Sequence, residues 1–170
     1  AKKHHLKNTG ISRIRKFKFI LKYNCKTKIS KKLIKNLDIE FSKFCNKQIL
    51  KLNTSNSLKY FLKKYKNKIK FHICSGSPDK DLKRTVKKIN LMKYFSSING
   101  SSQKKVTHIK KIRNNKLSTL FVGDSIEDYI SSKKTNTLFV CKINKESKNQ
   151  FKNKNVERIY NFYQLEKYIF

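Results

Sequence analysis

The stretch of sequence that says most about the fold is STLFVGDSIED, residues 118–128. Its apolar run is typical of a buried β-strand, and the run stops at Gly123 before a helical pattern begins. Asp124, Glu127 and Asp128 follow, although the whole chain has only 10 acidic residues. Asp124 and Asp128 are four residues apart and can face the same side, and such oxygen ligands suit Mg²⁺. Capping of the helix N-terminus by acidic residues is the alternative interpretation.

Apolar runs alternate with helical patterns on both sides of this stretch. Strands are predicted at residues 69–74, 94–98, 118–123 and 137–143, with a shorter strand and a terminal helix after residue 157. The stretch between the last two strands, KESKNQFKNKN, is predicted as a polar loop. Alternation of this kind predicts an α/β domain over residues 67–170, a Rossmann-like parallel sheet flanked by helices.

The first part of the chain has a different hydrophobic pattern. Apolar side chains recur at helical spacing in three segments: residues 11–23, a longer segment that begins after Ser30, and residues 58–65. No strand-like run occurs among them. Residues 1–66 are therefore predicted to form a separate small helical domain.

Polar residues follow two other predicted strands where each strand ends. Ser75 and Gly76 come after the strand at 69–74, and a hydroxyl followed by backbone N–H donors makes a natural phosphate cradle. Lys105, or its neighbour Lys104, begins the helix after the strand at 94–98. Because the carboxyl ends of parallel strands meet at one edge of a sheet, we expect these groups to lie near Asp124 and Asp128.

The composition is strongly basic, with a net charge of +33 from 43 Lys and Arg residues. A positive surface of this kind attracts phosphate-bearing partners, and it would bind nucleic acid non-specifically. No apolar stretch approaches the ~20 residues of a membrane span, and no signal-peptide core is visible. We therefore expect a cytoplasmic protein with no membrane contact, in which the four cysteines are reduced thiols.

Taken together, the three strand ends resemble the ordered motifs of the haloacid dehalogenase (HAD) superfamily, in its phosphatase branch. Ser75 resembles the second motif, Lys105 the third, and Asp124 with Asp128 the fourth, while the leading helices look like the helical cap of such enzymes. The resemblance implies Mg²⁺-dependent hydrolysis of a phosphomonoester through an aspartyl-phosphate. It implies a small phosphorylated metabolite as substrate, with phosphoglycolate and sugar phosphates as the usual range. Ser75, Gly76, Lys105 and Arg13 would then contact that substrate.

The nucleophile motif of the family, an Asp-x-Asp after a first hydrophobic strand, has no counterpart here. Nothing before Asp38 is acidic, and the chain begins at Ala1. We expect the nucleophilic aspartate to lie upstream of this fragment, so that the fragment alone is inactive. The alternatives are a catalytically dead remnant of such an enzyme and a basic nucleic-acid-binding protein.

Overall fold

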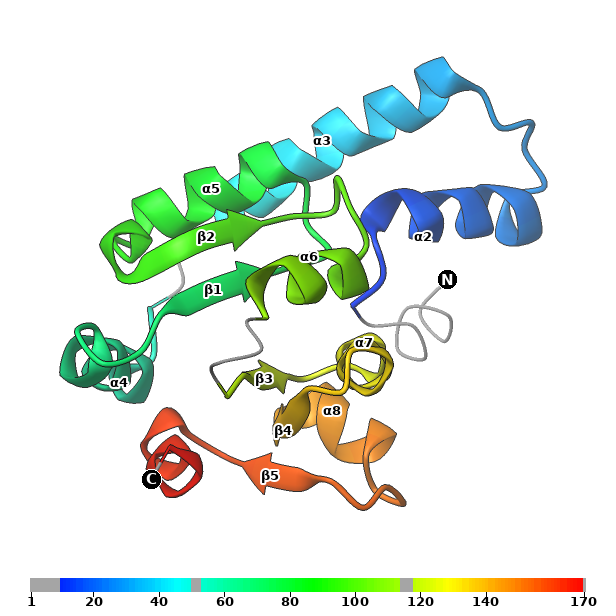
Figure 1. Cartoon of the computed structure of the whole chain (residues 1–170). Coiled ribbons are helices and arrows are strands. Elements are labelled where there is room, and N and C mark those ends of the chain that lie inside the picture. Colours follow the sequence, from blue (N-terminus) through cyan, green and yellow to red (C-terminus); the bar gives the residue numbers. More distant parts are fainter. Residues whose placement is uncertain (1–9, 50–52, 114–117, 170) are drawn as a thin grey trace.

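The computed structural model describes residues 10–49, 53–113 and 118–169, and within these ranges the chain is an α/β protein with parallel strands (Figure 1). The strands are β1 (Phe71–Cys74), β2 (Phe95–Asn99), β3 (Leu120–Gly123), β4 (Leu138–Lys142) and β5 (Glu157–Ile159). The α-helices are α2 (Arg13–Phe19), α3 (Lys31–Ile49), α4 (Asn56–Tyr65), α5 (Asp79–Lys88), α6 (Lys105–Ile112), α7 (Ile126–Lys134) and α8 (Lys145–Gln150). A π-helical turn, η1 (Ile20–Asn24), extends α2, and the 3₁₀ segments are η2 (Met92–Tyr94) and η3 (Phe162–Tyr168).

The strands form two parallel sheets where the sequence predicted one. Strand β1 pairs with β2, and the other sheet has the order β3-β4-β5. Strands β1 and β3 face each other between the sheets without pairing (Figure 1). No strand of the described residues lies between them, so each presents an unpaired edge of backbone N–H and C=O groups.

The two sheets are nevertheless held together by a shared hydrophobic cluster. Phe61 and Tyr65 of α4 pack with Val140 and Ile159 of the second sheet, and Phe71 of β1 packs against the same cluster. The helix at residues 58–65, which the sequence placed in the N-terminal helical domain, therefore packs with the α/β part. At the surface, η3 lies against α4, where Lys64 and Glu166 form an ion pair of 2.8 Å.

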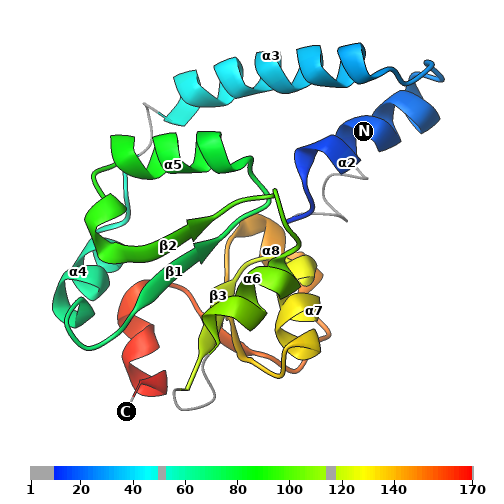
Figure 2. The same cartoon turned by 45° about the horizontal axis from the view of Figure 1, so that its top comes forward.

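Helices α2 and α3 form an N-terminal hairpin that lies beside α5 (Figure 2). The amide of Leu33 donates to Ser30 Oγ at 3.1 Å, which confirms Ser30 as the start of the long helix. Neither α2 nor α3 has a fully buried residue, so this hairpin contributes little to the hydrophobic core.

Two local predictions near the C-terminus were wrong. The segment predicted as a polar loop contains α8, because Asn144 and Ser147 cap its first turn through reciprocal hydrogen bonds of 2.8 and 2.7 Å. The predicted terminal helix is the 3₁₀ segment η3. Within the described ranges, no helix combines the length and the apolar character that crossing a bilayer requires.

Candidate functional site

The loop after β1 carries the first predicted site residue. Ser75 directly follows β1, and its amide donates to the carbonyl of Asn99 at 2.9 Å, so it continues the pairing with β2. The amide of Ser77 donates to Ser75 Oγ at 3.2 Å, which fixes the hydroxyl at the start of the turn into α5. Ser75 therefore lies at the carboxyl end of the first sheet.

Lys105 is the first residue of α6, and its ammonium group points into the protein. Its Nζ donates to Asp128 Oδ1 at 2.5 Å, and both side chains are more than 90 % buried. Lys104, by contrast, is exposed. A buried ion pair is maintained only where further hydrogen bonds satisfy the charges. The geometry therefore places Lys105, rather than Lys104, among the acidic residues after β3.

The N-terminus of α7 supplies those hydrogen bonds. Ser125 donates to Asp128 Oδ2 from its amide at 3.2 Å and from its hydroxyl at 2.6 Å. The amide of Asp128 donates back to Ser125 Oγ at 3.2 Å, which completes a capping box. Gly123 is required beside this box, because a Cβ at that position would lie 2.5 Å from Asp128 Cβ.

Asp124 differs from Asp128 in its surroundings. It is exposed, and its Oδ2 accepts a hydrogen bond of 2.8 Å from Asn144 Nδ2. Nearby protein atoms nevertheless exclude part of the water around the carboxylate, and this desolvation raises its pKa above the ordinary value. The negative charge of Asp128 raises the pKa further. The charge of Lys105 and the Asn144 hydrogen bond act in the opposite direction.

The chain enters α2 between the two strand-end loops. Gly10 has a φ of +84°, and a Cβ at Gly10 would overlap Ser125 Oγ. A Cβ at Gly76 would lie 2.8 Å from the carbonyl oxygen of Gly10. Gly76 and Ser125 thus both lie against Gly10, so the loops after β1 and β3 come close to the same part of the chain. At the start of α5, Asp79 accepts hydrogen bonds from the amides of Gly100 and Ser102, at 2.9 and 3.1 Å.

Arg13 lies in a cavity between α2, α3 and α5 that also reaches Ser75 and Gly76. Its guanidinium contacts Asp81 Oδ2 at 2.5 Å and Ser42 Oγ at 2.7 Å, and its Nε lies 3.4 Å from the carboxylate of Asp38. The resemblance implied a substrate contact for Arg13. In the structure, this side chain links the N-terminal hairpin to α5.

The carboxylates after β3 suit Mg²⁺ in kind, since this ion binds through one or two carboxylates, water and phosphate oxygens. Asp124 is the better placed ligand because it is exposed, whereas both oxygens of Asp128 already accept hydrogen bonds. In the part of the chain that the structure describes, no group of three or more His, Cys, Asp or Glu side chains could hold a metal. A magnesium site at Asp124 would therefore depend on oxygens from phosphate, water or a segment outside the described residues.

The sequence interpretation did not assign roles to Ser125, Asn144, Asp79 or Asp81. A signal was present for Ser125, because Ser125-x-x-Asp128 has the spacing of a capping box. Asn144 lies just before α8 and Asp81 lies in α5, both far along the chain from their partners, so no local spacing indicates their contacts.

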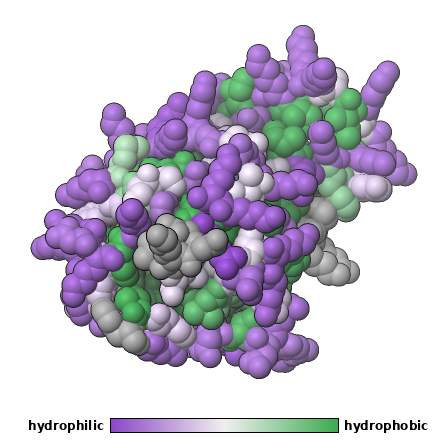
Figure 3. Space-filling model, viewed as in Figure 1, coloured by the Kyte–Doolittle hydropathy of each residue, from purple (hydrophilic) through white to green (hydrophobic). Residues whose placement is uncertain are grey.

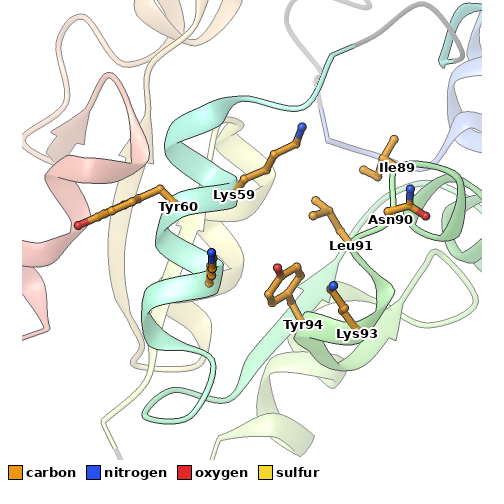
Figure 4. A pocket seen from close by; sticks show the side chains of 8 residues that line it. Lys59, Tyr60, Ile89, Asn90, Leu91, Lys93 and Tyr94 are labelled. Atoms are coloured by element: carbon orange, nitrogen blue, oxygen red, sulfur yellow. The ribbon is translucent and has the colours of Figure 1, made fainter.

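A second hollow of about 350 Å³ lies between α4 and the turn after α5 (Figure 4). Three lysines and two tyrosines are among the residues that line it: Lys59, Lys63, Lys93, Tyr60 and Tyr94. In Figure 4, the side chain of Tyr60 points away from Tyr94. None of the predicted site residues lines this hollow.

Comparison with known proteins leaves the family of this chain open. No protein-family model matches the sequence, and no curated protein matches it.

Proposed function

We propose that this chain is the larger part of a Mg²⁺-dependent phosphomonoester hydrolase of HAD type, in which a segment upstream of Ala1 supplies the nucleophilic aspartate. The reaction passes through an aspartyl-phosphate, which divides one difficult displacement into two easier ones. In this proposal, the α/β part is the Rossmann-like core of the enzyme, and the N-terminal hairpin is its cap.

The observation that carries the proposal is the buried Lys105–Asp128 ion pair at the edge where the loops after β1 and β3 meet. Burial of two charges is costly, and a hydrophobic pair of similar volume would serve stability as well or better. A lysine and a carboxylate held there, with Asp124 exposed beside them, are groups that suit the binding of a phosphoryl group and its metal.

The two unpaired strand edges support the same proposal. All pairings in both sheets are parallel, and β1 and β3 face each other without pairing. A parallel strand between β1 and β3 would join the two sheets and satisfy both edges. Its carboxyl end would lie beside Ser75 and Asp124, which is where an attacking aspartate is needed.

Each residue at the edge then has a definite task. The Ser75 hydroxyl and the Gly76 amide hold phosphoryl oxygens, and Lys105 offsets their negative charge. Asp128 keeps Lys105 oriented, and Asp124 would hold the metal. Bound Mg²⁺ would neutralise charge on the phosphate and on the attacking carboxylate.

The test compares two chains in p-nitrophenyl phosphate hydrolysis. We expect no Mg²⁺-dependent turnover from the 170-residue chain and clear turnover from a chain extended by the residues encoded directly upstream. In the extended chain, Asp124→Asn should lower kcat by about a hundredfold, because the metal loses its carboxylate ligand. Glu127→Gln is the matched control, since Glu127 is an acidic residue of the same turn without an assigned task.

Turnover by the 170-residue chain would show that the nucleophile has been placed wrongly. If an extended chain that carries an Asp-x-Asp motif stays inactive, or if the upstream sequence holds no such motif, the chain is the dead remnant and the hydrolase proposal fails.

The hollow of Figure 4 favours a second candidate function, non-specific binding of nucleic acid. Lysines beside tyrosine rings suit the backbone and the bases of single strands. This candidate predicts that affinity for an oligonucleotide falls steeply with salt and weakens when Lys59, Lys63 and Lys93 are changed together to Gln. It gives no reason for the buried Lys105–Asp128 pair.

A further inference from the structure

The cavity between the N-terminal hairpin and α5 has a volume of about 750 Å³, which is within the range of small-molecule sites. One end reaches the proposed phosphate cradle at Ser75 and Gly76. Much of the remaining wall is apolar and comes from both helices of the hairpin and from α5: Ile11, Phe17, Ile20, Phe41, Ile49 and Leu82.

The hairpin has an apolar surface that its own packing does not cover. Phe17 and Phe41 meet edge to face with ring centroids 5.7 Å apart, yet neither is buried, and Phe41 is 43 % exposed. Figure 3 shows hydrophobic side chains among the hydrophilic ones over the region of α2 and α3. The wall of the cavity is therefore apolar surface that a ligand could remove from water.

Several polar side chains of the cavity are bonded to one another, and Lys16 and Asn46 also line it. Arg13 contacts Asp81 and Ser42, and the Ser42 hydroxyl donates to Asp81 Oδ2 at 2.6 Å. The hydroxyl of Thr85 donates to the backbone carbonyl of Asp81 at 2.9 Å. A sugar needs many hydrogen-bond partners, and the bonds among Arg13, Ser42 and Asp81 leave these side chains fewer to offer.

The environment of Cys45 agrees with this description of the cavity. Burial raises the pKa of its thiol, and the negative charge of Asp81 raises it as well, while the charge of Arg13 acts in the opposite direction. The thiol therefore stays neutral in the cavity wall at neutral pH.

From these observations we infer that the cavity holds an uncharged, apolar leaving group, so that the substrate is a phosphomonoester of an aryl or similarly bulky hydrocarbon alcohol. The inference rests on the proposed function, because it takes the cradle at Ser75 as the place of the phosphate. It excludes phosphoglycolate and the sugar phosphates, which the family resemblance implied, as the preferred substrates.

The test measures binding to the 170-residue chain by the fluorescence of 1-naphthyl phosphate, which is convenient because the chain has no Trp. Glucose 6-phosphate and 2-phosphoglycolate serve as competitors. Glucose 6-phosphate carries the same phosphate group, and 2-phosphoglycolate is more anionic, so the net charge of +33 favours it over the probe. We expect 1-naphthyl phosphate to bind at least about tenfold more tightly than either competitor.

Two phenylalanines of α3 provide a matched pair of variants. Phe41 lines the cavity, whereas Phe44, three residues on and 59 % exposed, does not. Phe41→Ser should weaken the binding of 1-naphthyl phosphate about tenfold, and Phe44→Ser should change it less than about twofold. Phe41→Leu should restore most of the affinity, which separates loss of apolar surface from loss of folding.

The inference is overturned if either competitor binds as tightly as 1-naphthyl phosphate, or if the two serine variants weaken binding equally. The proposed function fails in a different way. If Ser75→Ala leaves the affinity for 1-naphthyl phosphate unchanged while Phe41→Ser lowers it, the cavity is apolar as inferred but the cradle does not hold phosphate.

Discussion

Acidic side chains are scarce in this chain, and several of them hold the strand-end edge together. Asp128 binds the ammonium of Lys105, and Asp81 binds the guanidinium of Arg13. Asp79 accepts two backbone amides from the loop after β2. Burial raises the pKa of Asp79, but these hydrogen bonds outweigh it and leave the pKa below its ordinary value. Asp124 is exposed at the same edge and remains the carboxylate best placed to meet a ligand.

The buried pair gives a prediction at the scale of a single residue. Lys105→Met leaves the Asp128 carboxylate buried without its cation, so the free energy of unfolding should fall by about 3 kcal/mol. Lys104→Met, which removes an exposed lysine next to it, should change the same quantity by less than about 0.5 kcal/mol. Urea unfolding of the two variants measures both. Equal effects would mean that the ion pair does not stabilise the folded chain.

Sequence spacing predicted part of this site and misjudged part of it. The four-residue interval between Asp124 and Asp128 indicated that both face one side, and both do lie at the edge. Spacing could not show that Gly123 allows Asp128 to turn inward, where Ser125 and Lys105 satisfy its oxygens. Asp128 is buried and Asp124 is exposed because Lys105, which belongs to another helix, lies beside Asp128.

At the scale of elements, periodicity identified most helices and strands but not their partners. The helix at residues 58–65 was expected beside α2 and α3, and its pattern alone could not show that Phe61 packs against the second sheet. Helix α8 was missed because its surface is almost wholly polar, although Phe151, directly after it, is fully buried. The hydrophobic pattern of a segment predicts that it is amphipathic. Which element its apolar face packs against depends on the rest of the chain.

The link between α2 and α5 gives a prediction at this scale. Burial would raise the pKa of Asp81, but hydrogen bonds from Ser42 and Arg13 and the charge of Arg13 outweigh it and hold the pKa below the ordinary value of 3.8. The folded chain therefore keeps this carboxylate ionised where the unfolded chain has begun to take up a proton. The resulting stability is complete above about pH 4 and is lost as the pH falls through the lowered pKa.

Thermal unfolding of the wild-type chain and of Asp81→Asn from pH 7 to pH 2 measures this effect. We expect the variant to be less stable by about 2 kcal/mol at pH 7 and the difference to shrink below about pH 4. Glu40→Gln removes an acidic residue of α3 that is paired only at the surface, with Lys43. It should change stability by less than about 0.5 kcal/mol. A difference that persists unchanged to pH 2 would contradict the assignment to the Asp81 carboxylate.

At the scale of the whole molecule, the two sheets are connected through helices and side chains but not through strand pairing. Helix α4 and η3 join them through the hydrophobic cluster and the Lys64–Glu166 ion pair, and Lys105 and Asp128 join them where the strands end. Along the strands, β1 and β3 present unpaired edges to each other. The sequence predicted one sheet because every strand was recognised as parallel, and the pattern of a strand does not show which other strands it pairs with.

Amide hydrogen exchange at β1 and β3 tests the proposed completion of the sheet most directly. The 170-residue chain is compared with the chain extended by the residues encoded upstream. We predict that Phe71–Cys74 and Leu120–Gly123 exchange at least about tenfold more slowly in the extended chain, while β5, which lies on the far side of the second sheet, changes little. Equal exchange at β1 and β3 in the two chains would show that no strand enters between the sheets, and the proposed enzyme would have no place for its nucleophile.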